Sequence, residues 1–236
     1  MLSGVQMADI CGGGQNSFAG ILLALLARGK TGKGQFVDIS MLDGAVSLLG
    51  QHAGNFFGNA IEPQRGRMNL NGGYACFNVY RAGDGKYLVL AALEEKFWAE
   101  YCRAIGKEAL IDEQYADLMR QTEIAAELQT IFDRKPCDEW IEYFKQFDTC
   151  VTAVNEFKDA FCDPQVLHRK MIQSLTYQSP DGEKTIKQLG IPIKLSDTPG
   201  SLRTGPPRLG QHTDEILAGL GYSAKDIELL HQKGVC

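Results

Sequence analysis

The sequence predicts a mixed α/β fold in which a middle α+β unit, at about residues 60–175, is framed by two outer pieces. Three observations carry this prediction, and the first two are that β-rich runs occur in pairs around Asp-Gly turns and that amphipathic helical patterns follow them. The third is composition, with 44% hydrophobic and 22% charged residues among 236, as is usual for a globular protein. This length suits one large domain or two small ones.

Charge and composition exclude several classes of function. The net charge is −5 and the basic residues are scattered, so we expect no nucleic-acid partner. The longest apolar run, Phe18–Ala27, is about ten residues and too short to span a bilayer, and no signal peptide is evident. The seven cysteines form no Cys-x-x-Cys pair. We therefore expect a reduced, cytoplasmic protein with no membrane partner.

The N-terminal piece is predicted to alternate strands and helices around two glycine-rich turns. Its elements are a short strand at Val5–Ile10, a helix from Asn16 or Ser17 to about Arg28, a strand at Gln35–Ser40 and a helix from Asp43 to about Phe57. The last helix is apolar on most sides, which predicts burial within the protein or in an oligomer interface.

The middle unit begins with a polar stretch, Gly58–Gly73, that is long for a structureless loop and therefore suggests a functional one. A hairpin follows around Asp84-Gly85. The predicted strands are Cys76–Tyr80, Tyr87–Leu93 and Cys150–Val154, and the predicted helices are Glu95–Ile105, Ile124–Phe132, Asp138–Phe147 and Glu156–Phe161.

The C-terminal piece carries a second hairpin signal, Ser179-Pro180-Asp181-Gly182-Glu183. Four prolines then mark an extended segment, because proline cannot donate to a helix or sheet ladder. The predicted elements are strands at Leu175–Tyr177 and Thr185–Leu189 and helices at Thr213–Ala218 and Ala224–Gln232.

The glycine run at positions 12–14 allows two interpretations. Gly12 and Gly14 match the first two glycines of a dinucleotide fingerprint, and Asp38 stands at a suitable distance for a ribose contact, which would indicate a dinucleotide-dependent oxidoreductase. Ser17 replaces the third glycine, however. Tight packing of a helix on a strand is the favoured interpretation.

Glu94 is the carboxylate of most interest, because it follows an apolar strand and immediately precedes a helix. Working groups are often exposed at such junctions in α/β folds. The alternative is an acidic residue that only favours the positive end of a helix.

Cys76 lies in a strand and is expected to be buried rather than nucleophilic. The four histidines are far apart, so no metal site is expected.

Several segments, taken in order, resemble the class III coenzyme A transferase family, which includes the α-methylacyl-CoA racemases. The most specific is Lys30–Gly44, and the others fit blocks of the family that lie before and after it. These other segments are Gln6–Gly14, Asn71–Gly73, Ala91–Trp98, Asp163–Gln165 and Leu209–Glu215.

The resemblance implies part of a doubly wound α/β large domain at residues 1–58, a small α+β domain with linkers at 59–175 and a C-terminal return to the large domain at 176–236. It also implies an interlocked homodimer that acts on acyl-CoA and carboxylic acid substrates and holds no permanently bound cofactor. Glu94 would assist a histidine that moves the α-proton of the thioester. Asn71, Gly72 and Gly73 would form a substrate-binding loop beside the thioester.

In the class III coenzyme A transferase family, the aspartate that attacks the thioester lies before the segment that matches Asp9–Gly14. We therefore expect this chain to be a truncated or C-terminal portion, inactive alone, because no acyl-enzyme forms without a nucleophile. A completing N-terminal chain is one expected partner. A non-catalytic partner subunit remains an alternative, as does the dinucleotide-dependent enzyme.

Overall fold

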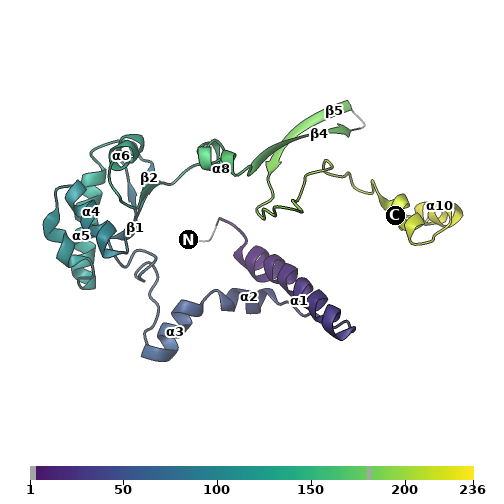
Figure 1. Ribbon diagram of the computed structural model, residues 1–236, viewed down its shortest axis with the longest axis horizontal. Coiled ribbons are helices and arrows are strands. Elements are labelled where there is room, and N and C mark those ends of the chain that lie inside the picture. Colours follow the sequence, from purple (N-terminus) through teal and green to yellow (C-terminus); the bar gives the residue numbers. More distant parts are fainter. Residues whose placement is uncertain (1–3, 180–181) are drawn as a thin grey trace. The chain divides into compact units, whose positions relative to one another are not determined.

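The computed structural model describes residues 4–179 and 182–236, which form two compact units, Met1–Val154 and Asn155–Cys236 (Figure 1). Each unit is described by itself below. The three-part division at residues 58 and 175 stays a prediction.

The first unit opens with a helix where a strand was predicted. Element η1 (Ala8–Gln15), a π-helix, runs directly into α1 (Asn16–Thr31). The strand prediction at Val5–Ile10 is therefore wrong. Once the strongly helical segment of α1 has nucleated, each residue added at its start gains a hydrogen bond, so the helix extends back through the glycine run.

The combined helix Ala8–Thr31 is 24 residues long. It is therefore much longer than the apolar run Phe18–Ala27 that it contains. By length and composition alone it could cross a membrane, a test that buried core helices of globular proteins also pass. It ends at Gly32, whose φ of 71° is the left-handed conformation that glycine adopts at no steric cost.

The segment after α1 is extended but forms no strand within the described residues, so the strand predicted at Gln35–Ser40 is also wrong. It instead packs on α1: a Cβ at Gly20 would lie 3.1 Å from side-chain atoms of Val37 and Ile39. Extended backbone becomes a strand only where a second strand offers a ladder.

The single helix predicted from Asp43 to Phe57 is two helices, α2 (Met41–Ser47) and α3 (Gly50–Asn59). Ser40 caps α2 by accepting a hydrogen bond from the Asp43 amide. Ser47 donates to the Gly44 carbonyl at 2.7 Å, a side-chain bond that competes with the helical ladder where α2 ends. Of the described residues in these two helices, only Gly44 is buried.

The middle of the chain forms an α+β body (Figure 1). The elements are β1 (Phe77–Arg81), β2 (Tyr87–Ala91), β3 (Val151–Ala153), α4 (Glu95–Ala104), η2 (Glu108–Glu113), α5 (Leu118–Phe132) and α6 (Cys137–Phe144). The antiparallel sheet has the order β1-β2-β3, with Phe77 opposite Ala91 and Leu90 opposite Val151. The predicted hairpin is confirmed, and α5 begins six residues earlier than expected because Asp117 caps it.

This body contains the hydrophobic core. Tyr101 stacks on Trp98 and Phe144 at centroid distances of 5.7 and 5.5 Å. Trp98 is 1% exposed, and its indole N–H donates to the Leu110 carbonyl at 2.9 Å. Each such buried side chain contributes roughly 1.5–3 kcal/mol of hydrophobic stabilisation. The core fixes α4, and with it the junction between β2 and α4.

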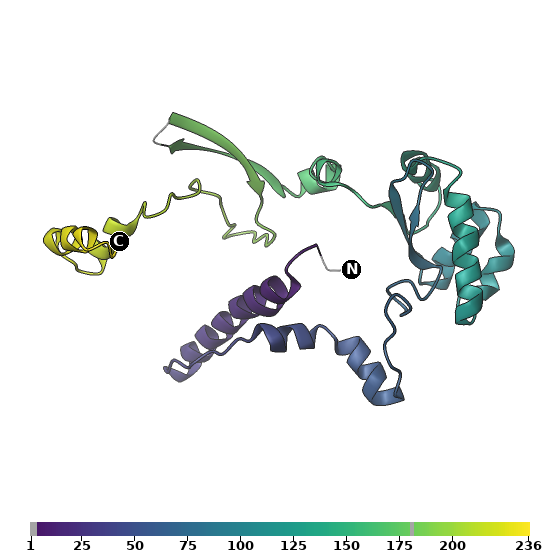
Figure 2. The ribbon, with the colours of Figure 1, turned by 180° about the vertical axis from the view of Figure 1, so that it is seen from behind.

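The second unit carries the predicted second hairpin, whose two strands appear as paired green arrows in Figure 2. Residues 180 and 181 of its predicted turn lie outside the described residues. The elements are α7 (Phe157–Ala160), α8 (Pro164–His168), β4 (Ile172–Ser179), β5 (Gly182–Leu189), α9 (Thr213–Gly219) and α10 (Ala224–Gln232). The extended segment packs on this hairpin, since a Cβ at Gly205 would lie 2.4 Å from the Tyr177 ring.

The packing of α9 on α10 is expected to weaken as pH rises. His231 Nε2 lies 2.7 Å from Asp214 Oδ1, and this hydrogen bond, followed by one to the Cys236 carbonyl, raises the pKa of His231. The folded state therefore binds the His231 proton more tightly than the unfolded state does. The resulting stabilisation of the folded state is fully present below the ordinary histidine pKa and is lost as pH rises through the raised value. Hydrogen exchange in α10 should therefore be slower at pH 6 than at pH 8 after correction for intrinsic rates. Asp214→Asn should abolish the difference.

Candidate functional site

One end of the small sheet gathers the residues that the sequence singled out. Because β1 and β2 are antiparallel, the segment entering β1 lies beside the segment leaving β2. Gly72 and Gly73 precede β1, and Glu94 follows β2. The Ala92 amide donates to the Cys76 carbonyl at 2.8 Å and continues the pairing toward this end.

Glu94 is exposed at the junction where β2 gives way to α4. Its backbone takes the N-cap position, with φ −72° and ψ 136°, and its carbonyl accepts from the amides of Phe97 and Trp98 at 3.0 and 3.1 Å. Within the described residues, its side chain makes no capping hydrogen bond. The helix start therefore uses the backbone of Glu94 and leaves the carboxylate available for another partner.

Asn71, Gly72 and Gly73 form a tight, hydrogen-bonded turn. The side-chain oxygen of Asn71 accepts from the Met68 amide at 2.8 Å, and the Gly73 amide donates to the Met68 carbonyl at 2.9 Å. Gly72 has a φ of 101°, and a Cβ at Gly73 would lie 2.6 Å from the Arg67 carbonyl oxygen. Both glycines are therefore required by the backbone.

A pocket of about 350 Å³ lies against this turn. Gly73 lines it, whereas Glu94 is not among its lining residues, so the structure brings only part of the predicted site to this cavity. The polar groups that line it were not singled out from the sequence and come from α3, the following loop and α5; they include Gln51, His52, Asn55, Arg67 and Gln121. The i, i+4 spacing of Gln51 and Asn55, which places both on one face of a helix, was the signal in the sequence that could have indicated this lining.

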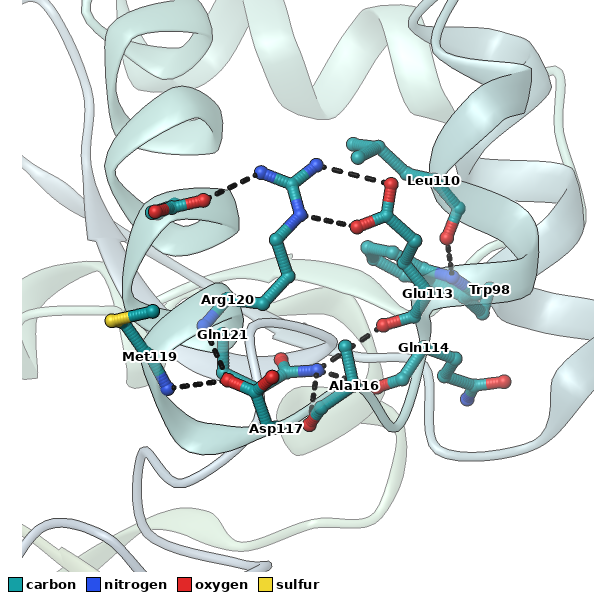
Figure 3. Close-up of polar contacts among 10 residues, drawn as sticks. Trp98, Leu110, Glu113, Gln114, Ala116, Asp117, Met119, Arg120 and Gln121 are labelled. Carbon is teal, nitrogen blue, oxygen red and sulfur yellow. Dashed lines mark hydrogen bonds and ion pairs between the residues drawn. The ribbon is translucent and has the colours of Figure 1, made fainter.

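Two buried glutamines hold this end of the body together. Gln121 accepts from the Ala75 amide at 2.9 Å and donates to the Gln114 carbonyl at 3.0 Å. Figure 3 shows the Gln121 side chain beside Gln114 and Ala116. Gln114 donates through its side chain to the carbonyls of Ala92 and Leu93 at 3.1 and 2.8 Å. A buried amide with its partners satisfied fixes the position of each segment it bonds.

Arg120 joins η2 to α5 beside these glutamines (Figure 3). Its guanidinium pairs with both carboxylate oxygens of Glu113 and with Glu123 at 3.0 Å. The paired guanidinium lowers the pKa of Glu113 and the two carboxylates raise that of Arg120. Because all three side chains are a third or more exposed, the network supports the local geometry and adds little stability.

The buried thiols of the body are poor nucleophiles. Cys76 is fully buried, as predicted, and burial raises its pKa. Burial raises the pKa of Cys102 to about 12. Thiolate is the reactive form of cysteine, so neither group is a candidate for covalent catalysis at neutral pH.

Thiol labelling tests this difference. All seven cysteines are free, and Cys162 and Cys236 are exposed. At pH 8 we expect an aromatic disulfide reagent to modify these two first, and Cys76 and Cys102 at least about a hundredfold more slowly because they must await unfolding. Peptide mapping of the labelled protein measures the order. Equal early labelling of Cys76 would show that the segment entering β1 is not buried in solution.

The glycine run does not form a dinucleotide site. Gly12 and Gly14 lie inside a helix instead of a strand-to-helix turn, and Asp38 is exposed on a segment that is not a strand. A Cβ at Gly44 would lie 2.2 Å from the Gly12 Cα, so these glycines allow close contact between η1 and α2. The favoured packing interpretation needs one correction, because the partner of the glycine run is a helix and not a strand.

Among residues 4–179 and 182–236, no group of three or more His, Cys, Asp or Glu side chains is placed to hold a metal ion. The site described above consists of the exposed carboxylate of Glu94, the glycine turn and the polar pocket beside that turn.

Comparison with known proteins identifies relatives along nearly the whole chain. The family described as CoA-transferase family III matches residues 1–213. An acyl-CoA transferase of Fusarium pseudograminearum is 33% identical over 220 residues, which are 91% of this chain and 48% of that protein. The α-methylacyl-CoA racemase of Mus musculus is 30% identical over 229 residues, 95% of this chain and 58% of that protein.

A solved structure of similar fold supports this match with CoA-transferase family III. The CAIB/BAIF family protein from Brucella suis superposes with a TM-score of 0.71 and 25% identity, covering 93% of this chain and 57% of that one. The chain thus spans about half the length of the curated relatives it matches. Two other relatives, from Chloroflexus aurantiacus and Thauera aromatica, are named as subunits of CoA-transferases.

Proposed function

The chain belongs to CoA-transferase family III, and on that premise we propose that it forms part of an enzyme acting on acyl-CoA thioesters. The observation that carries the proposal is the match over residues 1–213, together with relatives named for acyl-CoA transfer and α-methylacyl-CoA racemisation. The substrates are an acyl-CoA and, for transfer, a carboxylic acid. No resident cofactor is required by either reaction.

Glu94 is proposed as the catalytic carboxylate that this chain contributes. In racemisation, a base removes the α-proton of the thioester to give an enolate, and a proton returns to the opposite face of the same carbon. A carboxylate beside an imidazole base holds the ring in one tautomer and stabilises its charged form. The exposed side chain of Glu94, without a capping bond among the described residues, suits this role.

The turn at Asn71, Gly72 and Gly73 is proposed to bind the acyl thioester. Its two glycines let the backbone fold tightly on itself, and Gly73 places this turn in the lining of the neighbouring pocket. The neighbouring pocket, with Arg67 and His52 in its lining, gives polar contacts beside an apolar wall.

The remaining chemistry is proposed to come from the half of the relatives' length that this chain does not span. Among the described residues, α1 buries none, and Leu23 and Leu26 are 66% and 65% exposed. Apolar surface of this kind is normally covered. We propose that the rest of a doubly wound large domain covers it, supplied by polypeptide that corresponds to the unspanned half of the relatives, and that turnover requires this assembly. Free thiols suit a reducing, cytoplasmic setting.

An isotope experiment tests the function and separates its two forms. The assembly that co-purifies with this chain is incubated in D2O with 2-methylacyl-CoA thioesters, with and without an acceptor acid, and products are analysed by mass spectrometry. Racemisation predicts a gain of one deuterium at the α-carbon, whereas transfer predicts CoA on the acceptor without that gain. An assembly that does neither with any thioester of a chain-length series contradicts the proposal.

A subunit role is the second candidate, favoured by the relatives that are named as subunits. It predicts that this chain is required for turnover while Glu94→Gln leaves the rate unchanged.

A further inference from the structure

Tyr115 contacts the residue next to each half of the proposed site. Its ring meets that of Tyr74 edge to face, with centroids 5.2 Å apart, and its hydroxyl donates to the Leu93 carbonyl at 2.5 Å. Tyr74 directly follows Gly73, and Leu93 directly precedes Glu94. One side chain therefore connects the neighbour of the glycine turn to the neighbour of the carboxylate.

A second donor fixes the same carbonyl. The Gln114 side-chain amide donates to the Leu93 carbonyl at 2.8 Å and lies 3.3 Å from the Tyr115 hydroxyl. Gln114 is only 5% exposed, so its amide has no access to bulk water as an alternative partner. With two donors on one oxygen, the peptide before Glu94 is held in a single orientation, which fixes the backbone from which the carboxylate extends.

The Tyr115 hydroxyl bond is not forced by burial. Tyr115 is 53% exposed, and water can satisfy an exposed hydroxyl without any protein partner. Partial desolvation of the hydroxyl, together with nearby ionisable groups that include Cys76, Glu95 and Glu94, raises the Tyr115 pKa, so the hydroxyl keeps its proton at neutral pH and remains a donor.

From these contacts we infer that Tyr115 is a positioning residue that couples the Asn71–Gly73 turn to Glu94. The inference rests on the proposed function, because it assigns Tyr115 a purpose only if Glu94 and the turn serve one reaction. Tyr115 need not touch the substrate. Tyr115 would affect the reaction indirectly, by holding the main chain at Leu93 and with it the position of Glu94.

The first test uses the chain itself. The amides of Phe97 and Trp98 donate to the Glu94 carbonyl, so their hydrogen exchange reports how firmly this junction is held. Tyr115→Phe keeps the ring and removes only the hydroxyl, and exchange in residues 93–98 should become about three- to tenfold faster. Unchanged exchange there would overturn the inference.

Tyr143→Phe is the matched control. The Tyr143 hydroxyl also donates to a main-chain carbonyl, that of Ala104 at the far end of α4. Its removal should leave exchange in residues 93–98 as in the wild type. If Tyr143→Phe accelerates that segment as much as Tyr115→Phe does, the effect is general loosening and the inference fails.

The second test uses the active assembly. Tyr115→Phe should lower kcat about tenfold with KM within twofold, and it should change kcat less than twofold in a Glu94→Gln background, because it acts through that carboxylate. An equal loss in both backgrounds would overturn the coupling. If Glu94→Gln alone keeps full turnover, the proposed catalytic role of Glu94 fails, and the exchange experiment still decides whether Tyr115 holds the junction.

Discussion

Replacing Glu94 by glutamine should reduce turnover by the active assembly by about a hundredfold or more, the usual range for loss of an acid–base group. The amide keeps the size of the side chain and its place at the start of α4 but cannot carry negative charge. Since the side chain makes no capping bond among the described residues, thermal stability should stay near that of the wild type. Steady-state rates and a melting curve measured on the same preparation separate the two effects.

Glu95 supplies the control for this variant. It is the next residue, also an exposed glutamate, and it lies in the first turn of the same helix. Glu95→Gln changes the local charge equally and should leave kcat within about twofold, because solvent-exposed charges at a helix start have small effects. Equal losses in both variants would mean that the charge at this helix end matters and not the carboxylate of Glu94. A fully active Glu94→Gln variant would mean that Glu94 is only an acidic residue at the start of α4 and has no catalytic role.

Replacing Gly44 by alanine should separate α2 from η1. The new Cβ would lie 2.2 Å from the Gly12 Cα and 2.5 Å from its carbonyl oxygen, and neither backbone atom can rotate away. Overpacking of this kind costs about 1–3 kcal/mol. Hydrogen exchange across η1 and α2 should accordingly accelerate by up to about a hundredfold, since 1.4 kcal/mol corresponds to a factor of ten.

Gly29→Ala is the matched control for Gly44→Ala. Gly29 lies within α1, and a Cβ there would meet no atom within 4 Å. Alanine in an exposed helical position is favoured over glycine by about 1 kcal/mol, so this variant should slow exchange in α1. If Gly44→Ala exchanges like the wild type, the close contact between Gly12 and Gly44 does not persist in solution.

The middle body was the most predictable part of the fold, because its signals are local. Asp84-Gly85 between two β-rich runs predicts the hairpin, and Gly85 indeed adopts a φ of 83°. Asp117 shows why one helix boundary was missed: it caps α5 well before the apolar periodicity begins.

The N-terminal part was mispredicted because its structure depends on distant contacts. The glycine run suggests a turn, yet Gly12 lies in a helix and packs against Gly44, more than thirty positions away. Strand-like residues at Val37 and Ile39 pack on Gly20 without a ladder partner among the described residues. Tertiary packing overrides local propensity in both places.

The candidate site was predictable only in part. The position of Glu94 at a strand-to-helix junction is visible in the pattern, and its exposure follows from that position. Tyr115 and Gln114 reach Leu93 across more than twenty residues, and no periodicity or motif marks such a contact. Networks of this kind are found only once the segments are brought together in space.

Deuterium incorporation by the purified assembly tests the central claim most directly. The assembly is isolated through a tag on this chain and incubated in D2O with a series of 2-methylacyl-CoA thioesters and acceptor acids, while hydrogen exchange is followed at residues 67–75 and 93–98. We expect α-deuteration or CoA transfer, together with slower exchange in both segments when the thioester is bound. An assembly that catalyses neither reaction, and whose two segments exchange at the same rate with and without the thioester, contradicts this claim.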